Sequence, residues 1–347
     1  MNKGVSAPDI NPYLYRIPRR NVYSVDEYVY GIRHGIVAVL SQAVTLIESV
    51  KPEHRPLAQQ IIKECLPHTG NSIRIGITGV PGAGKSTMID TFGAYLIQQG
   101  RKIAVLAIDP SSERSKGSIL GDKTRMEALS QEKNAFIRPS PTAGSLGGVA
   151  RKTRETIIIC EAAGYDTIFV ETAGVGQSET TVHSMVDFFL LIQLAGAGDE
   201  LQGVKRGIME MADGVIINKA DGDNVNKAEI AANNYRNALN LFPLSNSGWS
   251  PRTLTCSGYY SLGIQKIWEM VSEYVVFTKK NGFFDRKRTE QAKYWMYESI
   301  NNLLHDTFFQ HPKIAAQLPQ IEQKVLNNEI SSFVAAKQMI DIFSETD

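Results

Sequence analysis

The stretch ITGVPGAGKSTMID, residues 77–90, contains the pattern G-x-x-x-x-G-K-[ST] between Gly79 and Ser86. An apolar, β-rich run precedes the pattern and a helical pattern follows it, which is the context in which it binds phosphate. Its glycines allow a turn tight enough for several backbone N–H groups to meet phosphate oxygens. Lys85 can reach the β- and γ-phosphates, and the Ser86 hydroxyl is a hard oxygen ligand suited to Mg²⁺. We therefore expect a nucleotide site at Gly79, Val80, Pro81, Gly82, Ala83, Gly84, Lys85, Ser86 and Thr87.

Short apolar runs rich in β-branched residues recur from residue 73 onward. They cover residues 73–78, 102–109, 166–172, 187–193 and 213–219. Helical patterns lie between most of them, at 85–99, 149–163 and 201–212. Strands that are buried on both faces and alternate with helices are typical of a parallel sheet. The pattern predicts an α/β fold, a P-loop NTPase G-domain with a mainly parallel sheet, completed by helices near 225–241 and 263–277 and a strand near 253–256.

Helical patterns flank this core at both ends. Ser24 and Glu27 fit a capping box, and helical apolar spacing continues from there to Val50, with a second short helix expected at 56–66. After Gly282 three more helices are expected, which are too few for an independent core and should pack on the α/β domain or on a second subunit. Their residues are 286–309, 312–326 and 331–343. The predicted domains are an N-terminal helical extension (1–70), a nucleotide-binding domain (71–280) and a C-terminal helical segment (281–347).

Charge and cysteine content exclude several classes of protein. The 37 Lys and Arg residues nearly balance the 36 Asp and Glu residues, so no bulk attraction to nucleic acid or to an anionic membrane is expected. The three cysteines are far apart, which suggests neither a disulfide framework nor a zinc knuckle. The apolar stretch from Phe188 is too short to span a bilayer, and no secretory signal opens the chain. We expect a cytoplasmic protein.

The sequence Asn218-Lys219-Ala220-Asp221 indicates which base is bound. An NKxD element at the end of a strand reads guanine in GTPases. A carboxylate at Asp221 accepts hydrogen bonds from the ring N–H and the exocyclic amine of guanine, and adenine has no such pair of donors. The stem of Lys219 can lie against the base. Residues 255–258, TCSG, follow a later strand where such domains close over the base, although an ordinary turn explains this short motif as well.

Two acidic residues end neighbouring strands of the predicted sheet. Asp109 ends the second strand and Glu171 the third, where strand ends face the nucleotide crevice of an α/β sheet. Carboxylates there can hold Mg²⁺ directly or through its waters. The run from Glu171 to Gly174 stands where many GTPases have DxxG. We expect Lys85, Asp109 and Glu171 to carry catalysis, and either carboxylate has the alternative of a solvated strand-end charge.

Three polar segments are candidates for switches that respond to the γ-phosphate. They are residues 111–126, 174–179 and 194–206. Asp122 can reach the site when the first segment closes, and Lys205 in the third can pair with a carboxylate in one nucleotide state. The group that positions the attacking water stays open between Gln177 and other residues. The lone His183 fits a packing role better than a catalytic one.

Several longer stretches then show a family resemblance. They are RIGITGVPGAGKST, AVLAIDPSS, GSILGDKTRM, FIRP, ICEAAGYD, GVGQSET, QLAGAGDELQGVKRGIMEMAD, NKADGDN and LTCSG with GIQKIW, in order over roughly residues 70–270. GSILGDKTRM and AGAGDELQG are far more specific than the P-loop. With them, the chain resembles the MeaB/ArgK-type GTPases, the methylmalonyl-CoA-mutase-associated G-protein chaperones.

This resemblance implies a Mg²⁺-dependent GTPase that converts GTP to GDP and phosphate. It implies docking on an adenosylcobalamin-dependent acyl-CoA mutase, with gating of cofactor loading and protection of the mutase, and a homodimer formed through the C-terminal helices. Motif matching places the metal site on Ser86, Asp109, Asp122 and Glu171. It places nucleotide contacts on the P-loop and on Asn218, Lys219, Asp221, Ser257, Gly258 and Tyr259. Ser257-Gly258-Tyr259 replaces the family's Ser-Ala-Leu, so we expect the closing contact to the base to differ.

Two other functions use a similar nucleotide engine. A metal-insertion GTPase usually carries cysteine or histidine near its switches, and this chain has only Cys160 and His183 in that general region. The other is a P-loop kinase that acts on a small molecule or a transport protein. Such a kinase would use ATP, and the NKxD element argues against ATP as the bound nucleotide.

Overall fold

The computed structural model describes residues 23–108, 126–139, 146–172, 178–196 and 206–344. These residues form a seven-stranded sheet in the order β3-β2-β4-β1-β5-β6-β7, in which every pairing is parallel. The strands are β1 (Ile73–Gly79), β2 (Ile103–Ile108), β3 (Ala135–Arg138), β4 (Thr167–Thr172), β5 (Phe188–Leu194), β6 (Gly214–Asn218) and β7 (Arg252–Thr255). The predicted parallel α/β fold is confirmed, and β1 with its P-loop lies at the centre of the sheet.

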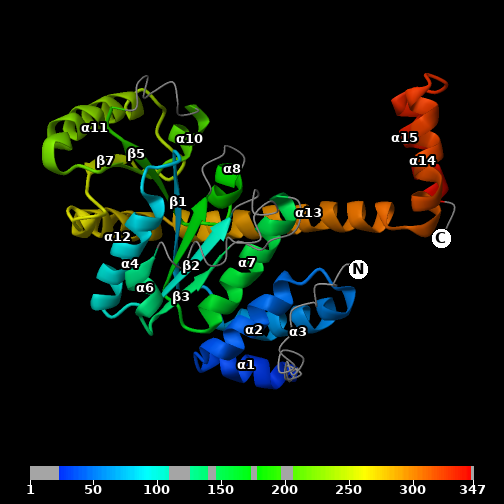
Figure 1. Ribbon diagram of the computed structural model, residues 1–347, viewed down its shortest axis with the longest axis horizontal. Helices are drawn as coiled ribbons and strands as arrows, with labels where there is room; N and C mark the ends of the chain where they lie inside the picture. Colours follow the sequence, from blue (N-terminus) through cyan, green and yellow to red (C-terminus); the bar gives the residue numbers. More distant parts are fainter. Residues whose placement is uncertain (1–22, 109–125, 140–145, 173–177, 197–205, 345–347) are drawn as a thin grey trace, which may run out of the picture.

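Helices cover both faces of the sheet because its strands are apolar on both (Figure 1). In β5, Phe188, Leu190 and Ile192 pack toward α4, α6 and α12, whereas Phe189 packs on the opposite side with α7 and α8. The helices of the domain are α4 (Lys85–Gln98), α6 (Glu127–Gln131), α7 (Leu146–Ala162), α8 (Ser178–His183), α10 (Arg206–Met211), η5 (Gly222–Asn224), α11 (Val225–Leu239) and α12 (Ile264–Lys280). No described helix combines the length and the apolar character that crossing a membrane requires.

The N-terminal helices pack as one layer against α7. They are α1 (Val25–Arg33), α2 (Val37–Glu48), η2 (Pro52–His54), α3 (Arg55–Cys65) and η3 (Leu66–His68). The capping box is confirmed, since Ser24 Oγ accepts from Glu27 N at 3.3 Å and Glu27 Oε2 accepts from Ser24 N at 2.7 Å. The continuous helical spacing expected up to Val50 is interrupted, however. Gly35 takes φ +66°, and the N–H groups of Gly35 and Ile36 close a Schellman motif that ends α1.

Short elements of the domain escaped the sequence pattern, among them the five-residue helix α6, strand β3 and helix α8. Strand β3 has four residues and pairs only with β2 among the described strands, so it carries too little periodicity to be recognised. Helix α8 has six residues and begins at Ser178, inside a segment that the sequence predicted to be a loop.

The C-terminal helices are α13 (Phe283–Phe309), α14 (Pro312–Leu326) and α15 (Ser332–Ser344). The buried side chains of α13 are Phe284, Gln291 and Trp295, all in its first half. Its second half runs away from the sheet and carries α14 and α15 at its far end, shown in orange to red in Figure 1. The first half of α13 therefore belongs to the packed domain, and the rest forms an arm.

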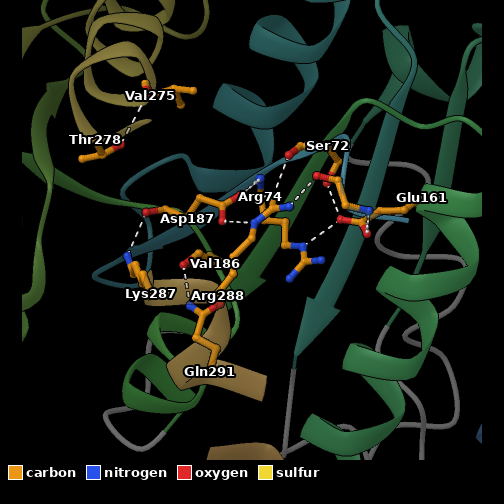
Figure 2. Close-up of polar contacts among 11 residues, drawn as sticks. Ser72, Arg74, Glu161, Val186, Asp187, Val275, Thr278, Lys287, Arg288 and Gln291 are labelled. Carbon is orange, nitrogen blue, oxygen red and sulfur yellow. Dashed lines mark hydrogen bonds and ion pairs between the residues drawn. The ribbon is translucent and has the colours of Figure 1, made fainter. Parts of the chain in front are cut away.

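One face of α13 binds the segment that leads from α8 into β5. Trp295 Nε1 donates to the carbonyl of Ser184 at 3.1 Å, and Gln291 Nε2 donates to that of Val186 at 2.8 Å. One further turn back, Lys287 Nζ donates to the Asp187 carbonyl at 2.8 Å. The spacing of four residues puts these three donors on one helix face, two of which Figure 2 shows. Successive turns of α13 thus hold three carbonyls of this segment.

A buried ion pair completes this anchor. The guanidinium of Arg288 donates to both carboxylate oxygens of Asp187, at 2.8 and 2.7 Å, and to the carbonyls of Gly70 and Ser72 (Figure 2). Burial favours a higher pKa for the Asp187 carboxyl, but the hydrogen bonds and charge of Arg288 outweigh it and lower that pKa. The pair is therefore charged at neutral pH and has its hydrogen bonds made.

Replacing Arg288 should destabilise the protein strongly. Arg288→Met leaves the Asp187 carboxylate, whose side chain is 2% exposed, without its partner, so we expect a loss of about 3–5 kcal/mol in the free energy of unfolding. Urea denaturation measures it. The matched control is Arg206→Met, which breaks a pair whose arginine side chain is 81% exposed and should cost less than about 1 kcal/mol. Equal losses in the two variants would contradict the anchoring role of Arg288.

Candidate functional site

The P-loop joins β1 to α4 at the centre of the sheet, and two of its glycines are sterically required. Gly79 has φ +154°, and a Cβ there would lie 2.1 Å from the Ile192 carbonyl oxygen of β5. Gly84 has φ +84°, and its Cβ would lie 2.7 Å from Asn218 Nδ2. A side chain at either position would push the loop off its neighbours. Glycine is therefore required at both positions, because neighbouring atoms leave no room for a side chain and because the backbone takes a positive φ.

Lys85 begins α4 and is only 8% exposed. Its Nζ donates to the carbonyl of Gly79 at 2.9 Å and to that of Val80 at 3.4 Å. Burial lowers the pKa of Lys85, while the carboxylates of Glu171 and Glu179 act in the opposite direction. The ammonium is held inside the P-loop, where phosphate oxygens could take the place of the carbonyls.

Ser86 and Glu171 meet at the edge of the sheet, as the strand-end argument predicts. Ser86 Oγ donates to Glu171 Oε1 at 3.0 Å, because Glu171 on β4 pairs in register with Ile77 on β1. A hydroxyl and a carboxylate at this spacing offer hard oxygen ligands and so fit a Mg²⁺ ion. Asp109 and Asp122, the other two predicted ligands, lie outside the described residues, as do Gly174, Gln177 and Lys205. Within the described part of the chain no three His, Cys, Asp or Glu residues gather as a metal cluster.

Asn218 links the phosphate loop to the predicted base loop. It ends β6 and is 2% exposed. Its Nδ2 donates to the Ala83 carbonyl at 2.8 Å, and its Oδ1 accepts from the Gly258 N–H at 3.0 Å and from Cys256 Sγ at 3.5 Å. The first residue of NKxD thus ties the two loops together.

Asp221 and Ser257 meet on the base side of the site. Ser257 Oγ donates to Asp221 Oδ2 at 2.5 Å, and the Ala220 N–H donates to the Cys256 carbonyl at 2.9 Å. Lys219 is exposed and takes φ +59°, with its carbonyl accepting from Asn224 Nδ2 at 2.8 Å. Ser257 bonds only to Oδ2, so Oδ1 of Asp221 can accept a hydrogen bond from a ligand. NKxD and TCSG, distant in sequence, therefore form one unit.

Two residues of the site carried no sequence signal of their own. Glu179, at the start of α8, is 2% exposed and its charge acts on Lys85, although its sequence context indicated a polar loop. Thr91 on α4 donates from Oγ1 to the Gly258 carbonyl at 2.6 Å.

His183 contacts Phe189 edge to face, with ring centroids 5.5 Å apart, and burial lowers the pKa of His183 to about 4. His183 is consequently neutral at pH 7 and packs, half-buried, against Phe189.

Comparison with known proteins identifies the family. A family model described as "Methylmalonyl Co-A mutase-associated GTPase MeaB" matches residues 40–313. The chain belongs to this family. It is accordingly a GTPase, an enzyme that hydrolyses GTP.

Individual relatives of this GTPase agree over nearly its whole length. A putative GTPase of Caulobacter vibrioides is 47% identical over 92% of this chain and 98% of its own. GTPase ArgK of Escherichia coli is 43% identical over 92% of this chain and 96% of its own. The mitochondrial methylmalonic aciduria type A homolog of Mus musculus is 44% identical over 92% of this chain and 79% of its own. A solved structure of the LAO/AO transport system kinase has a TM-score of 0.73 at 36% identity, covering 92% of this chain and 97% of that one.

Removing the Asn218 amide should loosen both loops at once. Asn218→Ala leaves the Ala83 carbonyl and the Gly258 N–H buried without their partner, and we expect a loss of about 2–3 kcal/mol in unfolding free energy. Affinity for GDP should fall at least about tenfold, since the pocket is no longer pre-organised. Urea denaturation and calorimetry measure the two effects, with Asn240→Ala on the exposed end of α11 as control. An Asn218→Ala protein that binds GDP like the parent would exclude the linking role.

Proposed function

We propose that this GTPase is a cytoplasmic chaperone for an adenosylcobalamin-dependent acyl-CoA mutase of the methylmalonyl-CoA mutase type, which gates cofactor loading and protects the mutase from inactivation. The observation that carries the proposal is the match of residues 40–313 to a family named for its association with that mutase. The name of the mouse relative, a methylmalonic aciduria type A homolog, supports the same client. The site would bind and hydrolyse GTP, and the state of the bound nucleotide could control such a client.

The proposed nucleotide contacts divide between two parts of the site. On the phosphate side, backbone N–H groups of the P-loop between residues 79 and 84, Pro81 excepted, and of the start of α4 would bind the phosphates. Lys85 would exchange its carbonyl partners for phosphate oxygens and stabilise negative charge as the γ-phosphoryl group leaves. On the base side, Asp221 would accept from guanine while Lys219 covers the ring.

Ser86 and Glu171 would hold Mg²⁺, together with Asp109 and Asp122 by motif matching. The ion would neutralise charge on the β- and γ-phosphate oxygens. The Ser86–Glu171 hydrogen bond supports this assignment, because it shows that the two oxygens already lie within 3.0 Å of each other. The three candidate switch segments follow β2, β4 and β5, which end at this same edge of the sheet, and would report the γ-phosphate to the client.

Mixing the GTPase with the mutase tests the proposal. We expect a complex whose affinity differs between GDP and a non-hydrolysable GTP analogue, and faster GTP turnover in the complex. Lys85→Ala should lower turnover by about 10²–10³-fold through the loss of charge stabilisation, whereas Lys280→Ala, an exposed lysine at the end of α12, should leave it unchanged. Phosphate release and sedimentation measure the outcome. The absence of both binding and any change in turnover with such mutases would remove the proposal.

A kinase function is the second candidate, because the solved relative is titled a LAO/AO transport system kinase. The two functions differ in the acceptor of the γ-phosphoryl group. Transfer of labelled γ-phosphate to a solute or a protein, instead of to water, would favour the kinase.

We also propose that the protein is a homodimer through its C-terminal helices. Tyr297, Ile300 and Leu304 on the α13 arm are 53%, 42% and 61% exposed, and their spacing puts them on one helix face. At the end of the arm, an apolar groove of about 520 Å³ lies between α13, α14 and α15. An isolated arm with an apolar stripe is more stable when a second copy covers it.

A charge in this stripe should separate the subunits. We expect the parent protein to be dimeric and Leu304→Lys to weaken dimerisation by about tenfold or more, because a lysine would be buried in the interface. Leu244→Lys, at a 74% exposed leucine outside the arm, should remain dimeric. Sedimentation velocity over a range of concentrations measures the change. A monomeric parent protein, or an unaffected Leu304→Lys dimer, would contradict the proposed interface.

A further inference from the structure

Residues 257–262 form a tight hairpin, here called the closing hairpin. The N–H and carbonyl groups of Ser257 and Leu262 exchange two backbone hydrogen bonds, both of 3.0 Å. Ser261 takes φ +59°, a conformation that non-glycine residues rarely adopt, so the surrounding contacts must hold the turn in place. The hairpin is therefore a fixed structure and not a loose loop.

The base of the closing hairpin is held by the nucleotide site itself. Ser257 Oγ bonds to Asp221, and the Gly258 N–H bonds to Asn218. The Gly258 carbonyl accepts from Thr91 on α4, and a Cβ at Gly258 would lie 3.3 Å from Met88 Cα. Whatever the hairpin displays is consequently positioned relative to both the guanine-reading carboxylate and the P-loop helix.

The hairpin displays two tyrosine rings. Tyr259 is 79% exposed and Tyr260 is 60% exposed. Their ring centroids lie 4.9 Å apart at an interplanar angle of 87°, so the edge of one ring meets the face of the other. The Tyr260 N–H also donates to Ser257 Oγ at 3.2 Å. Two large aromatic rings facing water on a rigid support are already arranged to cover a flat partner.

We propose that the ring of Tyr259 forms a wall of the guanine pocket and stacks on the base, and that Tyr260 supports it edge-on. Tyr259 directly follows Gly258, which Asn218 and Thr91 hold in place, whereas Tyr260 lies one residue further along the hairpin. The inference rests on the proposed nucleotide site. It adds a division of labour: Asp221 selects guanine by its edge, whereas Tyr259 contributes affinity through the ring face.

Stacking differs from edge recognition in a measurable way. Every purine offers the same kind of π-face, so a stacking residue contributes equally to nucleotides that differ only at the base edge. A hydrogen-bonding residue such as Asp221 instead changes the ratio between them. Comparing GDP with xanthosine diphosphate therefore separates the two roles.

Calorimetry on the full-length protein with GDP and xanthosine diphosphate tests the proposal. Tyr259→Ala should weaken both nucleotides by the same factor, about tenfold, from the lost stacking. Tyr259→Phe and Tyr259→Trp keep a flat ring and should stay within about twofold of the parent. Tyr260→Ala should have the smaller effect, because it removes only the support. Tyr30→Ala, at a 61% exposed tyrosine of α1, is the matched control and should change nothing.

Asp221→Asn distinguishes this inference from the proposed function. It should shift selectivity from GDP toward xanthosine diphosphate. If it does so while Tyr259→Ala leaves both affinities unchanged, the stacking role is overturned and the guanine site stands. If Tyr259→Ala alters the ratio of the two nucleotides, or if Tyr260→Ala costs more than Tyr259→Ala, the assignment of roles is equally overturned. If Asp221→Asn leaves selectivity unchanged, the guanine site itself fails.

Discussion

The amide of Asn218 is the interaction on which the architecture of the site depends. The P-loop follows β1 and NKxD follows β6, two strands away in the sheet, with β5 between them. One buried side chain spans this distance by donating to Ala83 and accepting from Gly258. Its fit requires glycine at 84, because a Cβ there would lie 2.7 Å from Asn218 Nδ2. The phosphate cradle and the closing hairpin are therefore parts of a single hydrogen-bonded unit.

Strand β5 connects this unit to the C-terminal arm. At its C-terminal end the Ile192 carbonyl lies so close to Gly79 that no side chain fits between them. At its start Asp187 receives the hydrogen bonds of Arg288 and of the Arg74 N–H (Figure 2). The same α13 that holds Asp187 continues into the arm. Strand β5 thus runs from the anchor of the proposed dimer arm to the side of the P-loop.

The sequence predicts the parts of this structure whose function restricts residue type. The P-loop glycines, NKxD and the Ser24–Glu27 capping box each need particular side chains at fixed spacing, and the apolar runs of β1 and β5 are long enough to be recognised. Features decided by tertiary packing escape such patterns. The helix break at Gly35 depends on a Schellman motif, and the burial of Glu179 depends on how α8 sits against the sheet. Strand β3 has too few residues to show a period at all.

The charges around Lys85 give a physical reason for the proposed divalent cation. Glu171 and Glu179 both act on the Lys85 ammonium, and Glu179 and Lys85 are almost completely buried. Lys85 by itself carries one positive charge, against two from these carboxylates and several more from a bound triphosphate. In a site of low dielectric constant such an excess of negative charge is costly unless further positive charge enters with the nucleotide. The partial charge at the start of α4 is small, so the proposed ion would add to the compensation that the P-loop N–H groups supply. Ser86 and Glu171, hydrogen-bonded to each other at this edge, have the oxygen atoms that Mg²⁺ prefers and lie where that charge is needed.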